Sequence, residues 1–93
     1  MRLDRFLWWV RLAKTRSAAQ AIAATGRLRI NGQATARAHH HVKEGDVLTF
    51  YANNRVRIVR VEALPNRRGP APEAQACYAD LAPANVSQQG VAD

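Results

Sequence analysis

The sequence contains a single cysteine, Cys77, which excludes an internal disulfide framework and a cysteine-ligated zinc site. No stretch approaches the ~20 consecutive apolar residues that a membrane span requires. Charged side chains at Arg2, Asp4, Arg5 and Arg11 interrupt the apolar segment that a signal peptide would need near the N-terminus. These absences predict a soluble cytoplasmic protein in a reducing compartment, with no contact to a membrane.

Negative charge is also scarce, and it is unevenly distributed. The chain has 14 Lys and Arg residues against 7 Asp and Glu residues, which gives a net charge of +7 over 93 residues. Residues 1–43 hold nine of the basic residues and one acid, Asp4. Twelve of the 14 basic residues are Arg, whose planar guanidinium matches phosphate geometry. The pattern favours a nucleic-acid partner over the alternative of a solvated basic surface.

The N-terminal third predicts two helices. Residues 3–12 carry an apolar stripe at helical spacing, formed by Leu3, Phe6, Leu7 and Val10. The second helix is expected over residues 16–25, with Thr15 as its N-cap and Gly26 as its stop signal. Its predicted buried face consists of Ala18, Ala21, Ile22 and Thr25.

After Gly26 the pattern changes to the period of a β-strand. Leu28 and Ile30 alternate with arginines, and Asn31-Gly32 is typical of a tight hairpin turn. Residues 34–41 have no clear period. Residues 42–50 predict strand, turn and strand, and residues 55–61 predict another strand after a turn at positions 53 and 54.

The C-terminal third is less regular. Residues 65–72 have the composition of a linker, and residues 73–81 predict a short helix that turns Ala74, Tyr78 and Leu81 toward the domain. The expected organisation is an RNA-binding domain over 1–64, a linker and packing helix over 65–82, and a disordered tail over 83–93. The fold class is α+β, with two N-terminal helices on a small, mainly antiparallel sheet.

Four motifs together resemble the S4 RNA-binding domain family. They are RLDRFL at residues 2–7, TRSAAQAI at 15–22, GRLRING at 26–32 and VKEGD at 42–46, in the order and spacing of that family. The resemblance covers residues 2 to 50. It implies the alpha-L arrangement of helices and sheet, and a non-enzymatic protein that binds structured RNA.

Two further segments are similar to the ribosome-associated heat-shock group of this family. They are LWWVR at residues 7–11 and RRGPAPEA at 67–74, followed by Tyr78. The resemblance implies ribosomal RNA and the large ribosomal subunit as partners, during recycling of stalled or dissociated complexes, with tRNA as a further candidate. Members of that group usually continue into a long charged segment, whereas this sequence has no Lys or Arg after Arg68.

The predicted RNA-binding residues combine this resemblance with electrostatics. A helix N-terminus attracts phosphate through its backbone N–H groups, and residues 14–17 place basic and hydroxyl side chains at such an end. The full predicted set is Arg2, Arg5, Arg11, Lys14, Thr15, Arg16, Ser17, Arg27, Arg29 and Lys43.

Two other clusters have competing interpretations. Trp8 and Trp9 are suited to stacking on bases, but packing is the favoured interpretation, either against the small core or at the seam with residues 70–81. Residues 39–41 are three consecutive histidines, and a solvent-facing loop is favoured over a metal site because only His39 and His41 would share a strand face. No cofactor and no metal are expected.

Three functions remain open on the residues alone. The first is a non-enzymatic RNA-binding module that acts as a monomer. The second is a stand-alone relative of the accessory domain of an RNA-modifying enzyme, although the sequence has no catalytic pair of acids and no nucleotide-binding glycine motif. The third is a general nucleic-acid-binding adaptor, for which two early helices in a basic chain can imitate a helix-turn-helix.

Overall fold

A computed structural model describes residues 1–52 and 54–81. It contains three helices, which are α1 (Leu3–Trp9), α2 (Arg16–Ala24) and α3 (Ala71–Gln75). The predicted tail at 83–93 lies outside the described residues, as does Asn53 of the predicted turn.

The strands form one antiparallel sheet. They are β1 (Leu28–Ile30), β2 (Gln33–Thr35), β3 (Val47–Ala52), β4 (Arg55–Val61) and β5 (Tyr78–Asp80). Their order across the sheet is β2-β1-β3-β4-β5, and each neighbouring pair is antiparallel. The α+β prediction is confirmed, with one more strand than the sequence pattern indicated.

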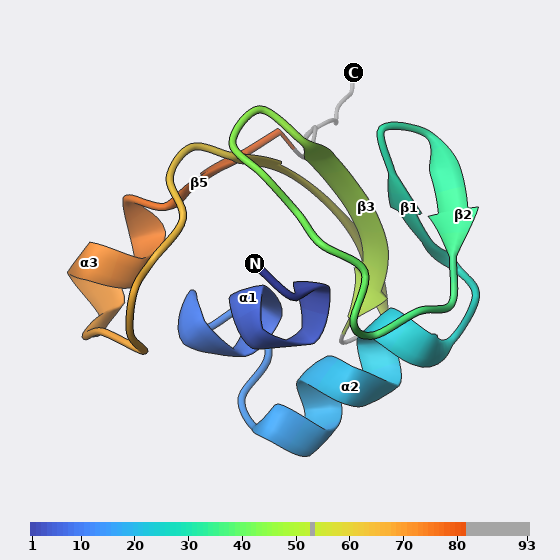
Figure 1. Cartoon of the computed structure of the whole chain (residues 1–93), viewed down its shortest axis with the longest axis horizontal. Helices are drawn as coiled ribbons and strands as arrows, with labels where there is room; N and C mark the ends of the chain where they lie inside the picture. Colours follow the sequence, from blue (N-terminus) through green and yellow to red (C-terminus); the bar gives the residue numbers. More distant parts are fainter. Residues whose placement is uncertain (53, 82–93) are drawn as a thin grey trace.

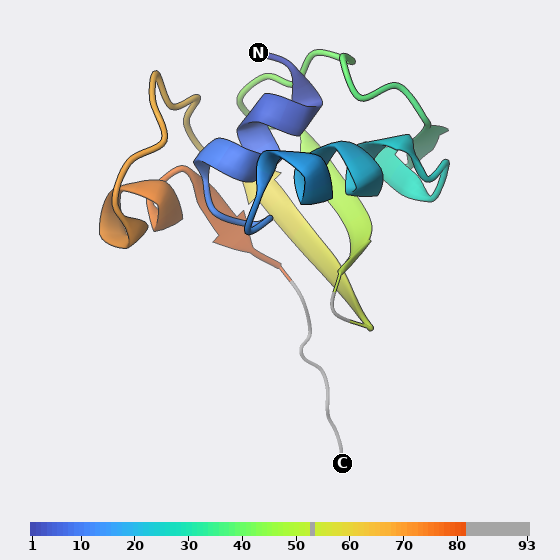
Figure 2. The same ribbon diagram turned by 90° about the horizontal axis from the view of Figure 1, so that it is seen from below.

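Helices α1 and α2 cover one face of the sheet. In Figure 1 both lie inside its curve, and Figure 2 shows α3 apart from them, near β5. The core between helices and sheet is formed by apolar side chains that are almost completely buried. The largest of them are Leu3, Phe6, Leu7 and Val10 from the first helical segment, with Leu28, Leu48, Phe50, Val59 and Val61 from the sheet.

The start of the chain is fastened to the loop that follows β2. The backbone N–H of Leu3 donates to the carbonyl of His40 at 2.7 Å, and that of Asp4 donates to the carbonyl of Ala38 at 3.0 Å. Arg2 and His41 also form an isolated antiparallel bridge. Because of these bonds, residues 38–42 run alongside the beginning of α1.

The β1–β2 hairpin is built as its sequence predicts. Asn31 and Gly32 have φ angles of 52° and 85°, the left-handed conformations that a two-residue type I′ turn requires. Asn31 also reaches the next strand, because its Nδ2 donates to Oδ1 of Asp46 at 3.1 Å and its Oδ1 accepts the N–H of Val47 at 2.9 Å. Asp46 is 5% exposed, and its other carboxylate oxygen accepts the N–H of Lys43 at 3.0 Å.

Both N-terminal helices differ in detail from the prediction. The first ends at Trp9 rather than at residue 12, because Arg11 adopts a φ of 64° that breaks the helix.

The second helix, α2, buries Ala19 and Ala23, whereas Ala18 and Ile22 are only partly buried. The predicted buried residues Ala21 and Thr25 are exposed. Ile22 is the one large apolar side chain of this alanine-rich helix, and a single such residue does not fix which face is buried.

The helix predicted over residues 73–81 forms only in part, because α3 ends at Gln75. The chain forms one short helix, α3, and then turns at Cys77 so that β5 pairs with the free edge of β4. Pairing satisfies backbone N–H and C=O groups that an edge strand leaves unbonded. Ala74 is buried as predicted, Tyr78 is half-buried, and Leu81 is 40% exposed. Residues 42 and 43, predicted as strand, are irregular.

Asp46→Ala is expected to lower the free energy of unfolding by about 2 kcal/mol, because Asn31 and the N–H of Lys43 lose a charged acceptor inside the fold. Urea denaturation followed by circular dichroism measures the change. Glu44→Ala, at an exposed neighbouring position, is the control and is expected to change it by less than about 0.5 kcal/mol. Equal effects for the two variants would contradict the assignment.

Candidate nucleic-acid interface

The basic residues of the N-terminal half are largely without ion pairs. Of the nine Lys and Arg residues in 1–43, only Arg2 has a carboxylate within ion-pair distance among the described residues. In the C-terminal half, by contrast, Arg57, Arg60 and Arg67 each form a salt bridge with Asp80, Glu62 and Glu73, respectively. The uncompensated positive charge is therefore concentrated on the first half of the chain.

Three of these arginines meet two tryptophans around one depression. Arg2, Arg5 and Arg16 line a hollow of about 370 Å³ together with Asp4, Trp8 and Trp9. We call it the tryptophan hollow. Arg2 immediately precedes α1, Arg5 lies in its first turn, and Arg16 is the first residue of α2. The packing of the two helices thus brings together three predicted site residues.

A buried carboxylate organises this cluster. Asp4 is 3% exposed, and its oxygens accept hydrogen bonds from Nε of Arg2 at 3.1 Å, Nη2 of Arg2 at 2.9 Å and the N–H of Arg5 at 2.8 Å. A negative charge at this end of α1 also interacts favourably with the helix dipole. Asp4 is thus the ion-pair partner of Arg2. Its effect is to hold the Arg2 guanidinium in one orientation beside the hollow.

Both tryptophans carry an arginine on one ring face. The Arg5 guanidinium lies 5.6 Å from the centre of the Trp9 ring, and that of Arg68 lies 5.6 Å from the Trp8 ring. Arg68 Nε also donates to the carbonyl of Trp8 at 3.2 Å. Trp8 packs against the core, whereas Trp9 is half-buried and lies outside the core cluster. The favoured packing interpretation thus holds for Trp8 at the core, while Trp9 borders a small cavity at the seam with Ala74 and Cys77.

The N-terminus of α2 adds polar groups near this hollow. Thr15 is the N-cap, because its Oγ1 accepts the N–H of Ala18 at 3.0 Å, which confirms the predicted cap. Ser17 is exposed in the first turn. Lys14 is also exposed, but it borders a different, mostly apolar groove beside Tyr51.

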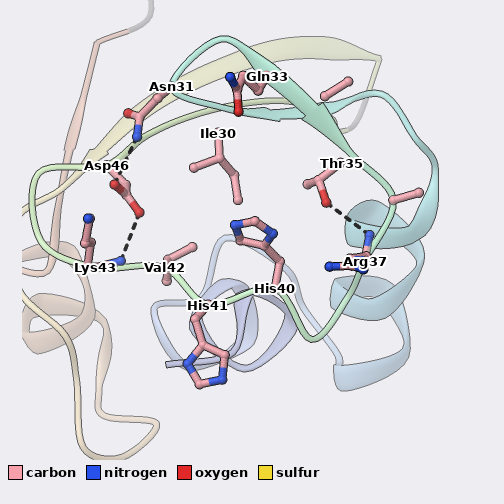
Figure 3. A pocket seen from close by; sticks show the side chains of 12 residues that line it. Ile30, Asn31, Gln33, Thr35, Arg37, His40, His41, Val42, Lys43 and Asp46 are labelled. Carbon is pink, nitrogen blue, oxygen red and sulfur yellow. Dashed lines mark hydrogen bonds between the residues drawn. The ribbon is translucent and has the colours of Figure 1, made fainter.

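A second hollow lies between the β1–β2 hairpin and the loop that follows it. We call it the hairpin hollow; it has a volume of about 760 Å³. Figure 3 shows Arg37 at one end, Lys43 beside Asp46 at the other, and the His40 ring between them, while His41 points away. Among the predicted residues only Lys43 belongs to it. Arg37 and His40 were missed, because residues 34–41 have no periodic pattern that would place their side chains.

Other predicted residues lie elsewhere. Leu28 and Ile30 face the core, so the intervening Arg29 projects from the opposite face of the sheet, where its Nη1 donates to the carbonyl of Gly32 at 3.2 Å. Arg27 is exposed just before β1. Arg11 turns to the linker and donates from Nε to the carbonyl of Gly69 at 2.8 Å. The tryptophan hollow thus brings together Arg2, Arg5 and Arg16, whereas Arg29 and Arg11 lie apart from it.

Cys77 is buried and lies just after α3. Burial, and to a lesser extent the nearby Glu73 carboxylate, raises the pKa of its thiol.

The described residues contain no group of three or more His, Cys, Asp or Glu side chains placed to hold a metal ion. Within the same residues, no helix is long and apolar enough to cross a membrane.

Comparison with protein families identifies the architecture around these hollows. Residues 1–48 match the model of the S4 domain. This range includes α1, α2, the β1–β2 hairpin and the Lys and Arg residues that line the tryptophan hollow and the hairpin hollow. The chain belongs to the S4 domain family. The resemblance seen in the four sequence motifs is therefore confirmed.

Several relatives lie within this family. Heat shock protein 15 homolog of Haemophilus influenzae is 37% identical over 78 residues, which are 84% of this chain and 59% of that protein. The RQC P-site tRNA stabilizing factor of Bacillus subtilis is 44% identical over 64 residues, 69% of this chain and 73% of that protein. A structure of Vibrio cholerae heat shock protein 15, described as trimeric, superposes with a TM-score of 0.79 at 34% identity, covering 88% of this chain and 82% of that one.

The chain spans 59% to 61% of the length of the heat shock protein 15 sequences from Haemophilus influenzae and Escherichia coli. The similarity covers the S4 domain and the segment that carries α3 and β5.

Thr15→Ala is expected to lower the free energy of unfolding by about 1 kcal/mol, because the N–H of Ala18 loses the hydroxyl that caps α2. Ser17→Ala removes a hydroxyl two positions along and is expected to change stability by less than about 0.5 kcal/mol. Thermal unfolding of both variants checks this. If Ser17→Ala were the more destabilising of the two, Ser17 and not Thr15 would be the cap.

Proposed function

We propose that this protein binds structured ribosomal RNA without catalysing a reaction, and that its target lies on the large ribosomal subunit during recycling of stalled or dissociated complexes. The observation that carries the proposal is the cluster of Arg2, Arg5 and Arg16 around one hollow at the helix ends, in a half-chain whose cations are largely without ion pairs. Such a surface matches the regularly spaced phosphates of an RNA backbone.

The relatives support the choice of RNA over other polyanions. The chain shares its S4 domain with heat shock protein 15 and with factors named for stabilising a P-site tRNA. The proposed partners are therefore ribosomal RNA and the large subunit, with tRNA as a possible neighbour at the same site. The cytoplasm, where ribosomes are, is the proposed location.

The proposed mechanism is clamping of phosphates from two sides. Arg16 and the first turn of α2 contact one phosphate group, and Arg2, oriented by Asp4, contacts a neighbouring one. Lys43 and Arg37 contact the backbone farther along, at the hairpin hollow. Because an A-form helix presents its bases poorly to side chains, selectivity comes from the shape of the RNA and from its unpaired positions.

The expected monomer stays a prediction. The Vibrio cholerae relative is described as trimeric, and sedimentation of this protein with and without RNA distinguishes the two states.

Arg5→Ala combined with Arg16→Ala is expected to weaken binding to large-subunit RNA by at least tenfold at moderate salt. It is also expected to reduce the slope of log K against log salt by about 0.8, because the phosphate contact of Arg16 is lost. Fluorescence anisotropy with labelled ribosomal RNA fragments, repeated across a salt series, measures both quantities.

The matched control is Arg57→Ala combined with Arg60→Ala, which removes the same charge from arginines already engaged by Asp80 and Glu62. It is expected to leave the slope nearly unchanged. If both double variants lose the same affinity, binding depends on net charge and the proposed interface is wrong. Duplex DNA that displaces the RNA at equal concentration would contradict the choice of RNA.

A further inference from the structure

The tryptophan hollow has a composition that phosphate binding alone does not explain. A phosphate site needs cationic groups and backbone N–H groups, but this hollow is also walled by Trp8 and Trp9, the only two tryptophans of the chain. Its volume of about 370 Å³ lies within the range of small-molecule sites, roughly 300–1,000 Å³. It is therefore large enough for a flat ring with an attached phosphate.

The two tryptophan rings differ in how firmly they are packed. Trp8 packs against the core and is fixed by Arg68, which covers one ring face and bonds to its carbonyl. Trp9 lies outside the core cluster; the Arg5 guanidinium covers one of its ring faces, and the residue also borders a small cavity with Gly69 and Cys77. Arg5 is exposed and Trp9 is half-buried, so the pair presents a flat platform to the hollow beside the firmly held Trp8.

The charged side chains around the Arg5–Trp9 pair indicate which class of ligand fits the hollow. Three guanidinium groups and one carboxylate line the hollow, and the carboxylate of Asp4 is already engaged by Arg2 and by the backbone of Arg5. The hollow therefore offers a ligand positive charge and aromatic ring surface. This combination fits a ligand with a π-surface and a negative charge, which in an RNA partner is a nucleotide. A paired base is covered on both faces by its neighbours, so only an unpaired base presents such a surface.

We propose that the tryptophan hollow binds one unpaired nucleotide of the RNA, with its base stacked on the Arg5–Trp9 pair and the two phosphates that flank it held by Arg16 and Arg2. This inference rests on the proposed function and goes beyond it, because it assigns an unpaired position of the RNA to a defined site on the protein. Unpaired bases stack both on aromatic rings and on arginine planes, and either component of the pair provides one.

The test compares two RNA hairpins that differ by one bulged 2-aminopurine, whose fluorescence falls when it stacks on an aromatic ring. The wild-type protein is expected to bind the bulged hairpin about tenfold more tightly than the fully paired one, and to quench the bulged base. This part of the test uses only the wild-type protein, so it does not depend on the folding of any variant.

Trp9→Ala is expected to abolish the preference for the bulge while keeping most of the affinity for the paired hairpin. Tyr51→Ala is the matched control, because Tyr51 is also an aromatic residue, is 52% exposed and lies outside the hollow. It is expected to leave the preference unchanged. Trp9→Phe keeps a ring on the platform and is expected to retain part of the preference.

The outcomes separate the two proposals. Equal binding of both hairpins by the wild type, or equal loss of the preference in Trp9→Ala and Tyr51→Ala, overturns the nucleotide site while the RNA-binding function stands. Failure of the wild type to bind either hairpin, or the large-subunit RNA, overturns the proposed function itself.

Discussion

The pairing of the first residues with the loop at 38–42 determines how the rest of this domain is arranged. Hydrogen bonds from Leu3 and Asp4 to the carbonyls of His40 and Ala38 fix where α1 begins, and the apolar stripe of that helix fixes which way it faces. Once α1 is placed, Asp4 is buried at its start and orients Arg2. The same contact draws the loop toward the helix, so the hairpin hollow and the tryptophan hollow lie on either side of the Arg2–His41 bridge.

The second constraint is electrostatic. The positive charges of a 93-residue chain with a net charge of +7 repel one another. The two halves of the chain differ in how many of these charges are paired with acids. Around β4, β5 and α3, Arg57, Arg60 and Arg67 are each paired with an acid. Around α1, α2 and the hairpin, only Arg2 has a carboxylate within ion-pair distance in the described part of the chain, so most of the positive charge there is uncompensated. An anion that bridged these side chains and bound only the folded state would stabilise that state.

Features that depend on neighbours in the sequence were predictable. The stripe of α1, the Thr15 cap and the Asn31-Gly32 turn each follow from a few adjacent residues, and all three are present. Features that depend on distant segments were not. Residues 76–81 favour β5 over helix only because β4 offers an open edge. Arg37 and His40 reach the hairpin hollow through a loop whose course is set by α1. Arg29 alternates with the buried Leu28 and Ile30 as predicted, but whether it lies with the basic residues of the helices depends on which side of the sheet the helices cover.

The buried Cys77 has a consequence for how this domain can be observed. A thiol reacts as its thiolate, and burial together with Glu73 keeps this one protonated, so thiol reagents in solution modify it slowly while β5 and α3 are in place. The rate of this reaction therefore measures how often the C-terminal segment opens. Hydrogen bonds of Arg11 and Arg68 hold that segment to the end of α1. Modification of Cys77 thus reports whether β5 is paired with β4.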